Sequence, residues 1–145
     1  MAKETNGRIF IAMKKAIQKI TKRVRPSWDE YFMALTDCVG SRSTCDKSGS
    51  GCVIVLDNRV IATGYTGSLS GLPHCNEVGH DINSGDCIRI IHAEHNAITQ
   101  ALKFGLSLDG ATMYCKTKPC SACTQMATTS GIKKIVLEKD IPVPY

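Results

Sequence analysis

The sequence has no long hydrophobic run, and this absence narrows the classes of protein to which it can belong. No stretch approaches the roughly 18–20 apolar residues that a membrane span requires, so we expect no membrane partner. Residues 1–25 have neither a continuous apolar stretch nor a cleavage site, which argues against a secretory signal. There is no internal repeat and no low-complexity tract. We therefore expect a cytoplasmic protein, or one of the host cytoplasm if the source is viral.

Length and composition are typical of one globular domain. The chain has 145 residues, of which 43% are hydrophobic and 21% charged. The formal net charge is +5, and much of it comes from Lys and Arg in residues 14–25. These cations could form a solvated helix face or attract phosphate-bearing molecules. The excess is too small to indicate nucleic acid as a partner.

Eight cysteines are many for a chain of this size. Without a secretory signal disulfides are not expected, which leaves metal ligation or buried thiols as explanations. Cys38, Cys52 and Cys115 fall inside predicted helices or strands, where we expect them to act as apolar filling.

The first half of the chain contains signals for two helices and a hairpin. Residues 9–20 place apolar side chains at helical spacing among lysines, so the extension 1–25 is predicted to contain an amphipathic helix. Ser27 to Glu30 has the form of a capping box, which begins a second helix that Gly40 ends. Two β-prone runs, residues 53–56 and 60–63, then predict a hairpin.

The second half predicts an α/β fold. An irregular segment runs from Gly64 to about Cys87, and a loop of this length needs something to hold it, for which a metal is a candidate. After it the pattern is helix, strand, helix, strand, at residues 92–104, 111–116, 119–130 and 132–138. Such alternation predicts helices packed on a sheet.

The strongest functional signal is His92-Ala93-Glu94 followed by Pro-Cys120-x-x-Cys123. The two cysteines are one helical turn apart, so both sulfurs can reach one ion. They fall in the predicted first turn of a helix, where the dipole favours thiolate. His92 can supply a third ligand, which leaves one position open for water, as a catalytic zinc site needs.

Zinc lowers the pKa of its bound water, which makes hydroxide available at cellular pH. Glu94, two residues from His92, points to another side of the helix and can move protons without binding the metal. The pattern H-x-E…P-C-x-x-C is the recognised signature of zinc deaminases, which act on C4 of cytosine or C6 of adenine. The alternative to a catalytic zinc site is a closed, structural four-ligand site in which another Cys completes the shell.

Beyond this motif, residues 27–138 resemble the deoxycytidylate deaminase family, including its bacterial competence-operon relatives. The resemblance rests on residues 27–33, 42–45, 64–68, 74–75, 87, 92–98 and 119–123. It implies a three-layer α/β/α cytidine-deaminase-like fold with a central mixed sheet over residues 26–145. The implied activity is hydrolysis of dCMP, and also of dCTP if the specificity is broader, with dUMP feeding thymidylate synthesis. The resemblance further implies a homo-oligomer, usually a hexamer, and regulation by dCTP and dTTP, with Mg²⁺ accompanying dCTP.

The resemblance also implies a second, structural zinc in the loops before the active site. Where some relatives have Gly-Cys, this chain has Gly followed by His80, and this change keeps a zinc ligand. The expected closed set is therefore Cys45, Cys75, His80 and Cys87. His74 could replace His80, or the thiols could be ordinary buried residues.

Candidate substrate-binding residues come mainly from the resemblance. The family usually has G-Y-N-G where this chain has Gly-Tyr65-Thr66-Gly, so Thr66 is expected in place of the Asn beside the nucleotide sugar. A hydroxyl offers fewer hydrogen bonds than an amide, which leaves the preference for mono- or triphosphate open. Tyr65 and Ala93 are further candidates. Arg42 and Lys118 could bind a substrate phosphate or be solvated surface charges.

Two other functions remain open from the sequence. A zinc deaminase could act on tRNA adenosine or on a free base, with the basic first helix as part of an extended contact surface. A non-enzymatic zinc-stabilised interaction protein would keep its function after Glu94→Gln. A purely structural site, however, has no need of a Glu beside an open zinc.

Overall fold

The computed structural model describes Ile11, residues 13–15 and residues 24–142. The backbone is helical at Ile11 and residues 13–15, but most of the helix predicted at 9–20 lies outside the described residues. Within the described ranges, no helix combines the length and the apolar composition that crossing a membrane requires.

The predicted helices and strands within residues 28–65 and 93–137 occur in the expected order, with several short elements between them. Their order is α2 (Trp28–Gly40), β1 (Gly51–Leu56), β2 (Arg59–Tyr65), β3 (Gly67–Ser68), α3 (Cys75–Val78), β4 (Ile82–Asn83), β5 (Asp86–Cys87), β6 (Ile90–Ile91), α4 (Ala93–Lys103), β7 (Thr112–Cys115), α5 (Ser121–Thr129), β8 (Lys134–Leu137) and a 3-10 turn (Glu138–Asp140).

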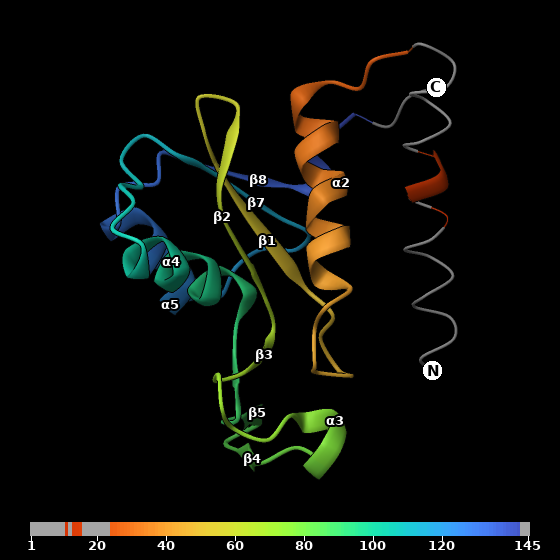
Figure 1. Ribbon diagram of the computed structural model, residues 1–145, viewed down its shortest axis with the longest axis vertical. Helices are drawn as coiled ribbons and strands as arrows, with labels where there is room; N and C mark the ends of the chain where they lie inside the picture. The colour runs from red at the N-terminus through yellow and green to blue at the C-terminus, as the bar shows by residue number, and fades with distance from the viewer. Residues whose placement is uncertain (1–10, 12, 16–23, 143–145) are drawn as a thin grey trace.

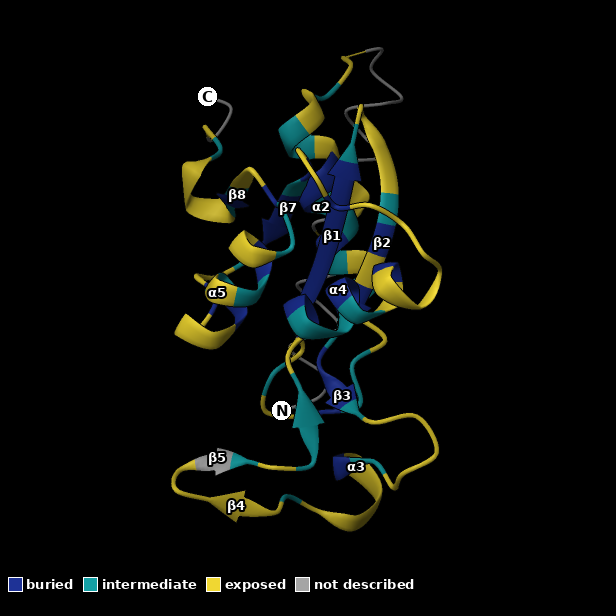
Figure 2. Ribbon diagram, turned by 90° about the vertical axis from the view of Figure 1, so that its left-hand side faces the viewer, coloured by how far each residue is buried: buried dark blue, intermediate teal, exposed yellow. Residues whose placement is uncertain are grey.

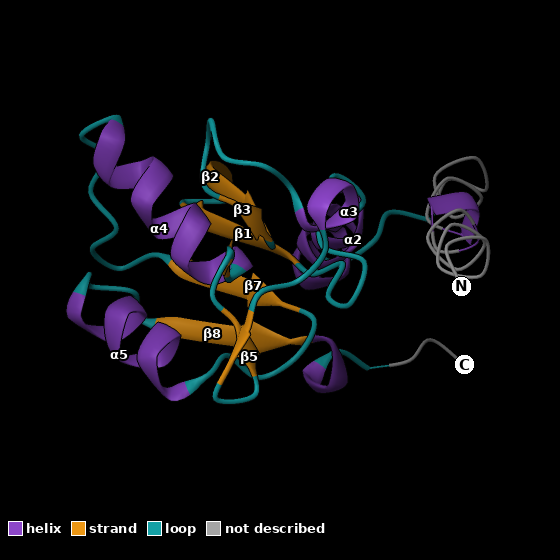
Figure 3. Ribbon diagram, turned by 90° about the horizontal axis from the view of Figure 1, so that it is seen from below, coloured by secondary structure: helices purple, strands orange, loops and turns teal. Residues whose placement is uncertain are grey.

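A central sheet with the strand order β2-β1-β7-β8 divides the molecule into layers. β1 is antiparallel to both β2 and β7, whereas β7 and β8 are parallel, so the sheet is mixed. Helix α2 covers one face, and α4 and α5 lie side by side on the other (Figures 1 and 3). The predicted three-layer α/β/α architecture is confirmed.

Strand β1 is buried because it lies between both helix layers (Figure 2). Alternate residues of a strand point to opposite faces, and the two hydrophobic clusters follow this rule. Val53 and Val55 pack in the cluster under α2, whereas Cys52 and Ile54 pack in the cluster under α4. The sheet is therefore a rigid support for the residues that follow its strands.

Capping and turn residues account for the element boundaries. Ser27 and Glu30 form the reciprocal hydrogen bonds of a capping box at the start of α2. Asp57 and Asn58 have positive φ values of 51° and 57°, as a tight hairpin turn between β1 and β2 requires. Gly105, with φ 65°, follows the end of α4.

The structure corrects three local predictions. Cys38 is exposed and does not fill the core, because it lies on the solvent side of α2, whereas Cys52 and Cys115 are buried as predicted. The segment 64–87 is not wholly irregular, since it contains the end of β2 and several short elements. Cys120 is the N-cap of α5 and not part of its first turn.

Candidate metal centre and active site

Two helix N-termini bring the first set of metal-ligand candidates together. His92 is the N-cap of α4 and Cys120 is the N-cap of α5. The two helices pack side by side on the same face of the sheet (Figure 1). As a result His92, Cys120 and Cys123 place one ligand atom each within 4.8 Å of one another.

The separations in this group fit a tetrahedral zinc site. Nδ1 of His92 lies 3.4 Å from Sγ of Cys120 and 3.6 Å from Sγ of Cys123. With Zn–S bonds of about 2.3 Å and Zn–N bonds of about 2.0–2.1 Å, ideal tetrahedral geometry separates nitrogen and sulfur by about 3.6 Å. The three residues therefore fit the ligand set predicted for the catalytic zinc.

The local environment favours the neutral thiol at Cys123. Burial, together with the neighbouring Cys120 thiol and Glu94 carboxylate, raises the pKa of Cys123 to about 12. Burial thus outweighs the effect of the helix N-terminus that the sequence led us to expect. A divalent cation supplies the charge that displaces the thiol proton when it binds.

Glu94 lies in the first turn of α4, two residues after His92, and is buried. Its carboxylate is close enough to act electrostatically on Cys123 and on Cys52 behind it in β1. The structure thus places a buried carboxylate beside the candidate zinc ligands, as a proton shuttle requires.

A second group of cysteines and histidine lies in the loops below the sheet. Cys75, His80 and Cys87 place ligand atoms within 4.8 Å of one another, and so do Cys45, Asp46 and His80. The sulfurs of Cys75 and Cys87 are 3.8 Å apart, and the edge of a ZnS₄ tetrahedron is also about 3.8 Å. Three of the four residues predicted for the second zinc, Cys75, His80 and Cys87, thus lie at a spacing that a metal could bridge, whereas Cys45 joins His80 only in the overlapping group.

The imidazole that joins this group is His80. His74 belongs to no such group in the described part of the chain and lines a separate cavity.

Hydrogen bonds shift the acidity of the second group. The pKa of His80 is raised by its contacts with the Cys87 thiol and the Asp46 carboxylate. The hydrogen bond from His80 in turn lowers the pKa of Asp46. Burial opposes ionisation of Cys87, but backbone hydrogen bonds and His80 lower the pKa of this thiol to about 7. A thiol of this acidity readily gives up its proton to a metal.

One side chain links two of the segments that carry candidate substrate-binding residues. Ser43 Oγ donates to the carbonyl oxygen of Thr66 over 2.5 Å, and the Thr66 amide donates to Ser50. This ties the loop that carries exposed Arg42 to buried Thr66. Ala93 is buried at the start of α4, and Lys118 is exposed two residues before Cys120.

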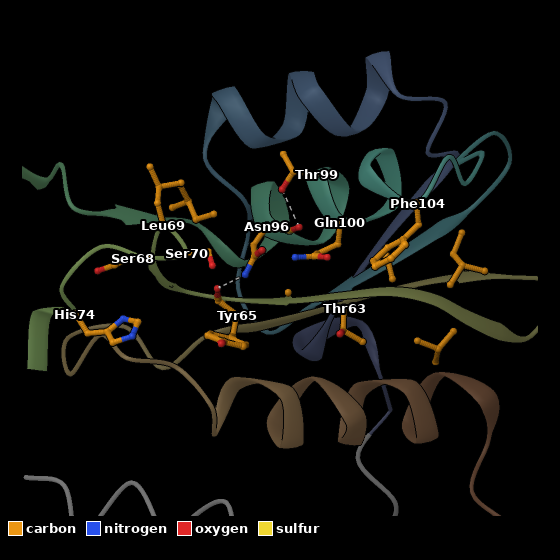
Figure 4. Close-up of a pocket in the computed structure, with 16 residues that line it drawn as sticks. Thr63, Tyr65, Ser68, Leu69, Ser70, His74, Asn96, Thr99, Gln100 and Phe104 are labelled. Atoms are coloured by element: carbon orange, nitrogen blue, oxygen red, sulfur yellow. Dashed lines mark hydrogen bonds between the residues drawn. The ribbon is translucent and has the colours of Figure 1, made fainter.

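Tyr65 lines a different cavity, of about 800 Å³, between the edge of β2 and the outer face of α4 (Figure 4). Asn96 Nδ2 donates to the Tyr65 carbonyl oxygen there, and Gln100 and Phe104 project from the same helix face. The candidate catalytic-zinc ligands His92, Cys120 and Cys123 do not line this cavity.

Comparison with known proteins identifies the family. The family model "Cytidine and deoxycytidylate deaminase zinc-binding region" matches residues 26–139. The chain belongs to this family. Among curated relatives of this deaminase family, ComE operon protein 2 of Bacillus subtilis (strain 168) is 43% identical over 122 residues, which cover 83% of this chain and 65% of that protein. The deoxycytidylate deaminase of Mycobacterium phage D29 is 36% identical over 128 residues, which cover 80% of this chain and 98% of that protein.

A solved structure of the family also matches. The dCMP deaminase of cyanophage S-TIM5, in complex with dCMP and dUMP, superposes with a TM-score of 0.68 at 27% identity, covering 78% of this chain and 82% of that one. The chain nevertheless spans only 65% of the B. subtilis protein and 38% of two yeast relatives.

Sequence reasoning missed Asp46 as part of the second group. Its side chain meets His80 at 2.6 Å although 34 residues separate them. The only signal was its position next to Cys45, and an Asp in a loop is too common to reveal such a contact.

Proposed function

We propose that this chain is a zinc-dependent enzyme that hydrolyses dCMP to dUMP and ammonia in the cytoplasm, supplying dUMP for thymidylate synthesis. The observation that carries the proposal is the His92, Cys120 and Cys123 group at tetrahedral spacing, with buried Glu94 in the adjoining helical turn. Family membership and the likeness to phage enzymes named for dCMP support the choice of substrate.

Glu94 would carry the protons of this reaction. His92, Cys120 and Cys123 would hold a zinc ion, whose charge would make a water acidic enough to attack near neutral pH. Glu94 takes a proton from the attacking water and donates it to N3 of the cytosine ring. C4 then carries a hydroxyl and the amino group. Glu94 moves the hydroxyl proton to the amine, which leaves as ammonia. The products are dUMP and ammonia, and Glu94 is again a carboxylate.

The remaining candidates would hold the nucleotide. Thr66 is positioned by hydrogen bonds through both its backbone amide and its carbonyl group, and its hydroxyl is the proposed contact to the sugar. Arg42 lies on the loop that Ser43 ties to Thr66, and Lys118 precedes the metal ligand Cys120, so both are proposed phosphate partners. Ala93 and Tyr65 would support the site through the packing of α4 on β2.

A substrate panel tests the proposed function. Purified zinc-loaded protein is assayed for ammonia release with dCMP, dCTP, CMP, deoxycytidine and an adenosine-bearing tRNA. We expect turnover with dCMP, and with dCTP as the secondary substrate. Deamination of the tRNA alone would replace this proposal with an RNA-directed activity. Zinc binding without turnover of any substrate would indicate an interaction protein.

We also propose the second zinc, held by Cys45, Cys75, His80 and Cys87 and serving to order the loops between β2 and α4. Cys75→Ser should lower the zinc content from two ions per chain to one and reduce thermal stability, because the site loses a thiolate. Elemental analysis and thermal denaturation measure both effects, with Cys38→Ser as the exposed control. An unchanged metal count would remove Cys75 from the ligand set.

A homo-oligomer, specifically a hexamer, is proposed with dCTP as activator and dTTP as inhibitor. The 800 Å³ cavity on α4 is separate from the zinc ligands and suits an effector. Its lining, within the described residues, includes no Lys or Arg, so a triphosphate would need cations from a second copy or an accompanying Mg²⁺. Assays of dCMP turnover with added dCTP, dTTP and Mg²⁺ test the regulation.

A further inference from the structure

The second cysteine-histidine group contains one contact that the proposed ligand set does not include. Nε2 of His80 lies 2.6 Å from Oδ1 of Asp46. Nδ1 of the same ring is buried and makes no hydrogen bond of regular geometry in the described part of the chain, while the ring also contacts the Cys87 thiol. The side chain of His80 is 14% exposed and that of Asp46 is 71% exposed. A surface carboxylate thus holds one nitrogen of a mostly buried imidazole and leaves the other without a regular hydrogen bond.

This arrangement suits a histidine that ligates a metal. The ligating nitrogen must offer its lone pair, so in the neutral ring the other nitrogen carries the proton. A carboxylate that accepts this proton fixes both the tautomer and the orientation of the ring. The geometry points to Asp46 as a positioning residue, whose carboxylate holds the Nε2–H of His80 so that Nδ1 ligates a divalent, zinc-like ion.

The thiols that would share this ion are close by. The ligand atoms of Cys75 and Cys87 lie within 4.8 Å of that of His80, and Cys45 is within the same range of His80 in the overlapping group. The inference rests on the proposed second zinc. It applies to a chain with histidine at position 80, because a cysteine thiolate has no tautomer to fix.

Asp46 could instead act on the ion directly, since its carboxylate is itself within 4.8 Å of the ligand atoms of Cys45 and His80. The two roles differ in what happens when His80 is replaced. A positioning role acts through the imidazole and disappears with it, whereas a direct ligand or a simple charge effect persists.

A double-mutant cycle separates these roles. Full-length wild type, Asp46→Asn, His80→Cys and the double variant are loaded with Zn²⁺, and zinc affinity is measured by competition with a chelator. Asp81→Asn, which removes an exposed carboxylate next to His80, is the matched control. We expect Asp46→Asn to raise the dissociation constant of the second site about 10–100-fold in the wild-type background. In the His80→Cys background, which retains a complete ligand set, it should cause no change.

An equal effect of Asp46→Asn in both backgrounds would overturn the positioning role, and so would no effect in either. If the proposal of a second zinc site is itself wrong, the result is different. In that case the wild-type chain binds one zinc ion, and His92→Ala removes it.

Discussion

Tyr114 connects the outer helix to the sheet through one hydrogen bond. Its ring packs in the cluster under α2, next to Phe32, and its hydroxyl donates to Oδ1 of Asp29 over 2.6 Å. Burial, together with the Asp29 carboxylate, holds the pKa of Tyr114 above its usual range. The neutral phenol is therefore the form that the folded state favours.

Tyr114→Phe should lower the free energy of unfolding by about 1.5 kcal/mol at neutral pH, the low end for hydrogen bonds to charged groups, because water can reach Asp29. The difference from wild type should shrink as the pH rises above about 10, where the phenol of the unfolded chain ionises. Urea denaturation across this pH range measures it, with exposed Tyr31→Phe as control. Equal stability of wild type and variant at pH 7 would contradict a net contribution from this hydrogen bond.

At the same scale, the sequence allowed prediction of contacts within a helical turn but not across loops. Cys120 and Cys123 are separated by one turn, so their shared face follows from local geometry. Asp46 reaches His80 only because the loop after α2 and the segment after α3 meet in space. Neither segment has a periodic pattern that predicts its path, so that contact required the structure.

Helix α4 lies unusually close to strand β2, and Gly64 makes this possible. A Cβ atom at Gly64 would overlap the carbonyl oxygen of Ala93 and the amide nitrogen of Ala97. The predicted zinc ligand His92 is the N-cap of α4. The distance between α4 and β2 therefore sets where that ligand lies.

Gly64→Ala should therefore destabilise the fold by about 2–3 kcal/mol through overpacking and weaken zinc binding at His92. Chemical denaturation and zinc analysis measure the two effects. Gly49→Ala is the matched control, since the nearest atom to its Cβ lies 4.0 Å away. A Gly64→Ala protein with wild-type stability would show that α4 can move without cost.

At the level of elements, the capping box at Ser27 and the Asp57-Asn58 turn allowed α2 and the hairpin to be placed to within one to three residues. From the sequence we interpreted Gly64 only as the start of a loop. Its role in helix packing was not predictable, because the close partner belongs to a helix about 30 residues further along the chain. The strand order, with β1 between β2 and β7, likewise came from tertiary contacts or from the family resemblance.

At the scale of the whole molecule, the surface carries exposed apolar side chains at the end of α4. Leu102 and Phe104 are 65% and 69% exposed, and Leu106 is 41% exposed. Leu102 and Leu106 line a hollow with Met126 of α5. Contiguous exposed apolar residues of this kind are typical of a protein interface, and they support the proposed homo-oligomer.

Leu102→Asp should dissociate that oligomer, because each interface would bury an unpaired charge. The folded subunit should keep its stability, since the side chain is already exposed. Light scattering coupled to size-exclusion chromatography measures the mass, with Leu72→Asp as an exposed loop control. A mass unchanged from a hexameric wild type would exclude this face from the interface.

The most direct test of the account is dCMP turnover by zinc-loaded wild type and Glu94→Gln at equal, measured zinc content. The account predicts dUMP formation by the wild type, with a loss of at least about 10²–10⁴-fold in the variant, because the amide cannot carry protons. Glu138→Gln, an exposed carboxylate near the C-terminus, should retain full turnover. Undiminished turnover by Glu94→Gln with zinc bound would contradict the assignment of Glu94 as the proton shuttle.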